Sequence, residues 1–169
     1  MNSTFVQGLE MPVRLVMAIV AGAAIGLNRW VHHKPAGLGT HGLVALGAAL
    51  ASILPSQLTG ADAQAASRVI QGVVTGVGFI GAGVIMRKNQ SQDVQGLTTA
   101  ASIWISAILG IACALSKIGI AATGLALALV ILFVSKPIEG MLEKIIQRRE
   151  NSSDLRRGPS DEFRNTGQA

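Results

Sequence analysis

Three glycines, Gly76, Gly78 and Gly81, have the spacing of a dinucleotide-binding turn. In that chemistry the turn follows a strand and opens a helix, and an acidic residue about 20 positions later binds the ribose. Here the glycines lie inside one apolar segment, and Asp93 comes too early and falls in a loop. The pattern therefore indicates close helix packing and no nucleotide cofactor.

A second pattern places small polar side chains along one face of a helix, at intervals of three or four residues. Its candidate functional residues are Thr98, Thr99, Ser102, Ser106 and Cys113, with Gly110 on the same face. Hydroxyl groups in hydrocarbon need hydrogen-bond partners. Two interpretations remain open: the face packs against another helix, or it forms a polar path for an ion or a small solute.

Metal and catalytic chemistry have little support. His32 and His33 point about 100° apart on a helix, and no carboxylate lies beside them or His41 to complete a transition-metal site. Magnesium prefers carboxylate and water oxygens, and no Asp or Glu lies well inside an apolar segment. No nucleophile is paired with a base. We therefore predict no enzyme activity, no resident metal and no cofactor.

The composition indicates which elements must position these residues. Half of the 169 residues are apolar, 14% are charged, and the mean hydropathy is +0.49. These values are typical of a membrane protein and leave too few charges for a water-exposed surface. Five apolar segments of roughly spanning length occur. They cover residues 11–27, 40–54, 69–86, 96–115 and 118–134, and the second is short enough to be re-entrant.

The distribution of Lys and Arg predicts an orientation. With five crossings, only Arg14, Arg68 and Lys117 of the 14 basic residues lie on one side of the membrane. We expect the N-terminus outside and the C-terminus in the cytoplasm. The net charge of +5 is explained by this asymmetry, because the basic residues cluster between apolar runs and do not form a nucleic-acid-binding face.

The predicted fold class is all-α: a polytopic bundle of about five transmembrane helices, followed by a short amphipathic helix. We divide the chain into a transmembrane domain at 1–136, an interfacial helix at 137–149 and a disordered tail at 150–169.

Glycines in the first and third spans predict close helix contacts. They are Gly22, Gly26, Gly72, Gly76, Gly78, Gly81 and Gly83. Because those of the third span fall on two opposite faces, we expect this span to be the central helix. Small faces on several helices also predict a homo-oligomer, most simply a dimer, in the lipid bilayer.

Three segments, "GAAIGLNRW...KPAGLGTHGLVALGAAL", "RVIQGVVTGVGFIGAGVIMR" and "VQGLTTAASIWISAILGIACAL", resemble the membrane domain of the MgtC/SapB family. The resemblance covers about residues 13–134, without the soluble C-terminal domain that some members carry. It implies a bacterial inner-membrane protein of about five spans. It also implies a link to growth at low magnesium and survival in hosts, by regulating other membrane proteins more than by carrying magnesium.

The chain departs from the family pattern at three positions. The family usually has Glu where this chain has Asn28, and Arg where it has Gly39 and Gln95. One acid and two bases are absent together, as expected if they pair in relatives. The predicted inner-edge cluster is Asn28, Arg29, Thr40, His41, Arg87 and Gln95.

The expected function is therefore that of a regulatory or interaction component in magnesium and stress homeostasis, which binds another membrane protein complex. The alternative is a small ion or solute transporter or channel, with its path along the hydroxyl face of the fourth span. The sequence identifies neither the partner nor a solute.

Overall fold

The computed structural model describes residues 3–58, 63–87 and 94–135. The chain divides into two compact units, Met1–Leu129 and Val130–Ala169, and the arrangement described below is that of the first. Of the second unit only residues 130–135 are described, and they are helical. The predicted interfacial helix at 137–149 and the tail at 150–169 lie outside the described residues.

Five long helices account for the apolar segments. They are α1 (Ser3–Val31), α2 (Leu38–Leu58), α3 (Ala63–Val84), α4 (Leu97–Ala114) and a fifth helix, Ile118–Ser135. Each is long and apolar enough to cross a membrane. The prediction of a helical membrane bundle with about five spans is confirmed. The second segment, whose apolar run is short enough to be re-entrant, forms a helix of 21 residues, or about 30 Å.

One feature between α3 and α4 is absent from the sequence predictions. Strands β1 (Met86–Arg87) and β2 (Val94–Gln95) pair in antiparallel register, with Met86 opposite Gln95. Gly96 then begins α4 with a left-handed φ of 95°, which favours glycine. A Cβ at this position would collide with the carbonyl oxygen of Val84, so glycine is required where the chain enters α4.

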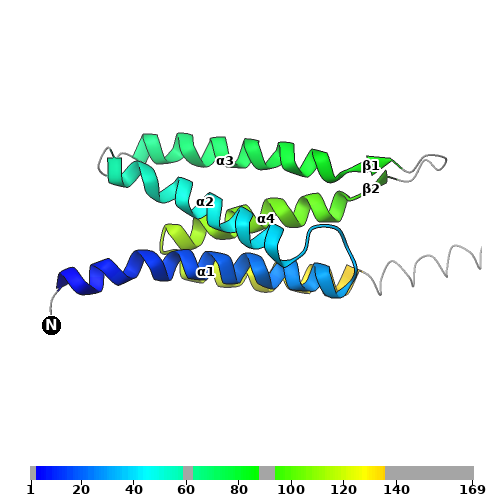
Figure 1. Cartoon of the computed structure of the whole chain (residues 1–169), viewed down its shortest axis with the longest axis horizontal. Helices are drawn as coiled ribbons and strands as arrows, with labels where there is room; N and C mark the ends of the chain where they lie inside the picture. The colour runs from blue at the N-terminus through cyan, green and yellow to red at the C-terminus, as the bar shows by residue number, and fades with distance from the viewer. Residues whose placement is uncertain (1–2, 59–62, 88–93, 136–169) are drawn as a thin grey trace, which may run out of the picture. The chain divides into compact units, whose positions relative to one another are not determined.

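The central helix is α4. It contacts α1, α2 and α3, and α1 and α2 also contact each other (Figure 1). In the spanning windows, 61% of α4 is buried but only 11% of α3. The prediction that α3 is the central helix is therefore wrong for the single chain. Small residues of α4 also permit close approach of other helices, and the neighbouring helices of this chain do contact α4.

Two of the predicted packing glycines lie where α1 contacts α2 and the residue before it. A Cβ at Gly22 would collide with the carbonyl oxygen of His41 and lie 2.8 Å from Ala45 Cβ. A Cβ at Gly26 would lie 2.7 Å from the carbonyl oxygen of Gly37. Both distances are shorter than a real side chain tolerates, so the absence of a side chain sets the approach of these helices.

The glycines of α3 differ among themselves. Gly81 faces Ala100 of α4, with 3.4 Å between its notional Cβ and that of Ala100. The other four meet no atom within 4 Å of a notional Cβ: Gly72, Gly76, Gly78 and Gly83. Their role in helix packing stays a prediction that requires a neighbour outside this chain.

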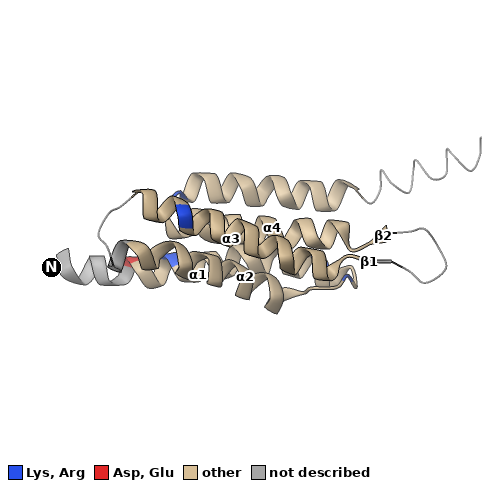
Figure 2. Ribbon diagram, turned by 90° about the horizontal axis from the view of Figure 1, so that it is seen from above, with Lys and Arg blue, Asp and Glu red and all other residues tan. Residues whose placement is uncertain are grey.

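Charged residues of the described chain lie toward the two ends of the bundle, and the segments between them are uncharged (Figure 2). This distribution matches the depth profile of a bilayer, where charge is costly at the centre and tolerated at the interface.

Candidate functional site

Three helix ends meet at one end of the bundle (Figure 1). The last turn of α1 supplies Asn28 and Arg29, the first turn of α2 supplies His41, and the first turns of α4 supply Thr99 and Ser102. All five side chains are buried. We call them the polar cluster. It contains part of the predicted inner-edge cluster and part of the predicted hydroxyl face.

Arg29 joins α1 to α4. Its Nη2 donates a hydrogen bond to Thr99 Oγ1 over 2.7 Å, and the Arg29 residue is 5% exposed. Its Nε is buried without a hydrogen-bond partner, and so is Nδ2 of Asn28. A guanidinium carries five N–H donors and stays charged under all ordinary conditions. The cation is therefore enclosed by protein with part of its donor capacity unused.

His41 joins α2 to α4. Its Nδ1 lies 3.0 Å from the carbonyl oxygen of Gly37, and its Nε2 lies 3.0 Å from Ser102 Oγ. Because a carbonyl only accepts, Nδ1 carries a hydrogen. Ser102 also donates to the carbonyl oxygen of Thr99 over 2.8 Å. In neutral His41, the single hydroxyl hydrogen of Ser102 thus has two acceptors, Nε2 and that carbonyl oxygen.

The hydroxyl face of α4 is buried against neighbouring helices. Ser106 is fully buried and donates to the carbonyl oxygen of Ser102 over 2.9 Å. Cys113 is also buried. A Cβ on Gly110 would collide with the carbonyl oxygen of Ala45 in α2. Between Ser102 and Gly110 this face therefore packs closely in the described chain, as the first of the two interpretations predicts.

The remaining predicted residues lie around the polar cluster. Thr40 and Gln95 are exposed, and Thr98 is exposed while its neighbour Thr99 is buried. Arg87 lies in β1, opposite Val94. Sequence reasoning assigned Thr99 and Ser102 to a separate face and missed their contact with Arg29 and His41. Their position in the first turns of the fourth span, at the membrane edge with the basic residues, is the signal that could have revealed it.

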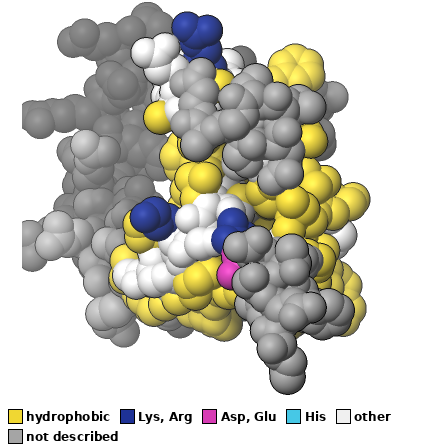
Figure 3. Space-filling model, turned by 90° about the vertical axis from the view of Figure 1, so that its left-hand side faces the viewer, with side chains coloured by type: hydrophobic (Ala, Val, Ile, Leu, Met, Phe, Trp, Pro, Cys, Tyr) yellow, Lys and Arg dark blue, Asp and Glu magenta, His cyan; other side chains and the backbone are white. Residues whose placement is uncertain are grey.

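The opposite end of the bundle differs in the exposure of its charged side chains (Figure 3). Arg14 pairs with Glu10 over 3.1 Å on the surface of α1, where their side chains are 35% and 54% exposed. Arg14 Nη1 also donates to the carbonyl oxygen of Ala114 over 3.4 Å. The charge of Arg14 is thus paired and partly solvated, in contrast to that of Arg29.

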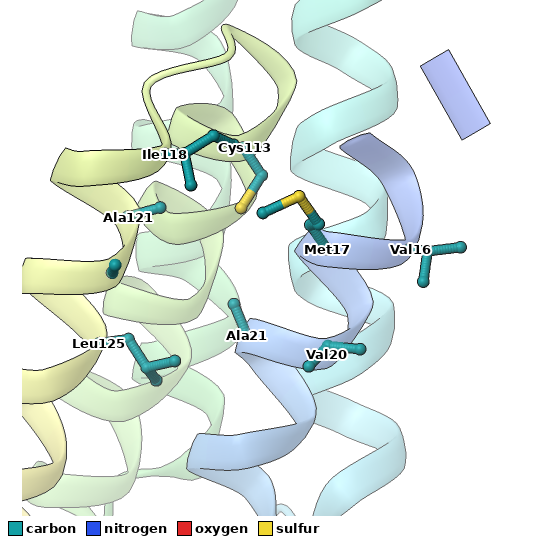
Figure 4. Close-up of a pocket in the computed structure, with 9 residues that line it drawn as sticks. Val16, Met17, Val20, Ala21, Cys113, Ile118, Ala121 and Leu125 are labelled. Atoms are coloured by element: carbon teal, nitrogen blue, oxygen red, sulfur yellow. The ribbon is translucent and has the colours of Figure 1, made fainter. Parts of the chain in front are cut away.

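An apolar pocket of about 230 Å³ lies near the same end. Figure 4 shows Met17 of α1, Cys113 of α4 and Leu125 of the fifth helix around it. Its lining is apolar apart from the thiol and exposes almost no polar atoms. This pocket does not provide a hydrated path, and among the described residues no three His, Cys, Asp or Glu side chains gather to hold a metal ion.

Comparison with known proteins identifies the family. The MgtC family profile matches residues 15–141. The chain therefore belongs to the MgtC family. This MgtC family member is 45% identical over 127 residues to the protein SrpB of Synechococcus elongatus. The aligned region covers 68% of the chain and 70% of SrpB.

Two other relatives of this MgtC family member are longer. It is 44% identical over 110 residues to the "Putative magnesium transporter YhiD" of Escherichia coli, covering 60% of the chain and 49% of YhiD. It is 44% identical over 105 residues to the protein MgtC of Salmonella typhimurium, covering 62% of the chain and 43% of that protein. The chain thus spans about half of these two relatives or less. No solved structure matches it.

Proposed function

We propose that this protein is a regulatory or interaction component of other membrane proteins, linked to magnesium homeostasis and to stress or host adaptation. The relative named "Putative magnesium transporter YhiD" supports the link to magnesium. In this proposal the protein is not an enzyme. It lies in the bacterial inner membrane with its N-terminus outside and its C-terminus in the cytoplasm, as its basic residues predict.

The observation that carries this proposal is a face of α3 that no other described residue covers. Gly72, Gly76, Phe79 and Gly83 follow one another at helical spacing and therefore share one face. Phe79 is 83% exposed, and the three glycines have open space where a side chain would begin. We call these four residues the α3 glycine face.

A transmembrane helix of another protein fits this face better than lipid does. Within the bilayer, the neighbours of a spanning helix are acyl chains or other spanning helices. Glycines spaced by about one turn let two helix backbones approach closely, and a large side chain between them sets the register. In this proposal the occupant is a single helix of the regulated protein. Homo-oligomer formation, most simply a dimer, is a separate proposal that rests on small-residue faces on several helices.

The transporter alternative finds less support. Its proposed path follows the hydroxyl face of α4, whose Ser102 and Ser106 are buried and bonded to backbone carbonyl groups of their own helix. A conducting path needs groups that coordinate the solute and room for it to move. The close contact of Gly110 with Ala45 leaves no such room in this arrangement.

A comparison of flux and co-purification tests the proposal. The purified protein in liposomes is expected to give no magnesium or proton flux above that of empty liposomes. The same tagged protein, isolated from membranes in mild detergent, is expected to retain a defined membrane protein, and Gly76→Leu is expected to lose it. Gly47→Leu on α2, where a side chain also meets nothing, is the matched control. Flux that disappears in a Ser102→Ala, Ser106→Ala variant would favour transport instead.

A further inference from the structure

The polar cluster lacks a counterion among the described residues. Glu10 is the only acidic residue whose side chain is described, and it pairs with Arg14. It lies 19 residues before Arg29 on the same helix, which is about 28 Å. Burying an unpaired cation is costly, and such groups in proteins are normally matched by a negative charge. Arg29 therefore requires a negative charge from outside the described residues.

Two helix N-termini add to the positive potential. The first turns of α2 and α4 lie at the cluster, and a helix N-terminus carries roughly half a positive charge. Gly96, at the start of α4, makes no side-chain capping hydrogen bond. The C-terminal turn of α1 offsets one of these contributions. The net field is that of the Arg29 cation with about one partial positive charge beside it.

Unpartnered donors point to a ligand as well. Nε of Arg29 and Nδ2 of Asn28 are buried N–H groups without acceptors. A buried donor left without a partner destabilises the folded protein, and a charged donor does so more. A water molecule would satisfy the donors but would leave the charge unmatched. An anionic oxygen satisfies both requirements.

We infer that the polar cluster binds a phosphate group through Arg29, and Asn28, the preceding residue of α1, adds a further free donor at this helix end. A phosphate offers several acceptor oxygens to the fork of an arginine. The source is either the phosphate of an anionic phospholipid or free inorganic phosphate. The lipid source agrees with the position at the membrane edge, where Trp30 next to Arg29 is 66% exposed and basic pockets between helices bind anionic headgroups.

This site is independent of the proposed regulatory function. It lies at the ends of α1, α2 and α4, whereas partner binding is assigned to the α3 glycine face. Loss of one therefore leaves the other measurable.

The test uses the purified full chain in a mild detergent and two probes. In the first arm, native mass spectrometry measures retention of phosphatidylglycerol against phosphatidylcholine. In the second arm, thermal unfolding is followed in inorganic phosphate and in chloride at equal ionic strength. Preferential retention of phosphatidylglycerol identifies the lipid as the source, and stabilisation by inorganic phosphate identifies the free ion.

Four variants assign the effect to the polar cluster. Arg29→Gln removes the cation, and Asn28→Glu adds a negative charge beside it. Each is expected to weaken binding of the phosphate probe by on the order of tenfold. This factor corresponds to the loss of about one charge-assisted hydrogen bond. Asn28→Gln keeps an amide and is expected to retain binding. Arg14→Gln removes a cation at the opposite end and is expected to behave as wild type. If the Arg29→Gln variant does not fold, binding of the phosphate probe by the Asn28→Glu variant still tests the proposal.

The proposal is overturned if neither probe binds, which would assign the free donors to water and the negative charge to an acidic residue of the chain outside the described residues. It is also overturned if Arg14→Gln weakens binding as much as Arg29→Gln, because the effect would then be general surface charge. Co-purification of an acidic protein that depends on Arg29, with no response to either phosphate probe, would assign the site to a partner carboxylate and also refute it.

Discussion

Gly22 of α1 lies at a helix contact within this chain, whereas Gly76 of α3 lies on an open face. Replacing each of them by alanine tests this difference. At Gly22, a Cβ would lie 2.8 Å from Ala45 Cβ and 2.9 Å from the backbone carbon of His41, and would collide with the carbonyl oxygen of His41. At Gly76, a Cβ meets nothing within 4 Å. Both positions lie inside long helices, so the chemical change is the same.

The expected magnitudes follow from two effects. Gly→Ala inside a helix gains about 1 kcal/mol of helix propensity at either position. At Gly22 the added methyl group also overpacks a backbone contact, which costs about 1–3 kcal/mol. Since the propensity gain is common to both, Gly22→Ala is expected to have a free energy of unfolding about 1–3 kcal/mol lower than that of Gly76→Ala.

Reversible unfolding in mixed detergent micelles, followed by tryptophan fluorescence at low protein concentration, measures this difference. Low concentration keeps association from contributing to the stability of Gly76→Ala. Gly47→Ala on α2, another helical glycine with open space, serves as the control and is expected to match Gly76→Ala. Equal unfolding free energies for all three variants would refute the assignment of Gly22 to the contact between α1 and α2.

Three further predictions concern topology, the polar cluster and association. In a Cys113→Ala background, an impermeant thiol reagent added to intact cells is expected to label Ser116→Cys and not Lys34→Cys; the reverse pattern would contradict the orientation. Ser102→Ala is expected to lower the free energy of unfolding in micelles by about 1 kcal/mol, because His41 Nε2 loses its partner. Ser106→Ala is expected to change it less, because the Ser106 hydroxyl bonds to its own helix. Light-scattering mass in lipid discs is expected to show a dimer, and a monodisperse monomer would count against the homo-oligomer.

The helices are predictable from sequence because the bilayer dictates them. Backbone groups in hydrocarbon must be satisfied within each segment, so a long apolar run becomes a helix. The turn around Gly96 and the pairing of Met86 with Gln95 are not predictable in this way, because they depend on how two particular helices meet. Length and hydropathy carry no information about such a local contact.

Residue types predicted the site only in part. Arg29 and His41 stood out as ionisable groups at a membrane edge, and the structure places both in the polar cluster. Their partners on α4 come from a distant segment, and the spacing of Thr99 and Ser102 carries no information on which helix faces them. The central position of α3 was wrongly predicted from Gly76 and Gly78 because a small residue shows where a helix can approach, not whether one does.

The central claim is that α3 binds a helix of another membrane protein, and site-specific photo-crosslinking in native membranes tests it most directly. Phe79 on the α3 glycine face and Leu43 on α2, which are 83% and 70% exposed, are each replaced by p-benzoylphenylalanine. The Phe79 probe is expected to form one defined adduct with another membrane protein that Gly76→Leu abolishes, and the Leu43 probe is expected to react only with lipid. Lipid adducts alone at both positions, or an adduct at Phe79 that contains only a second copy of this chain, would contradict the claim.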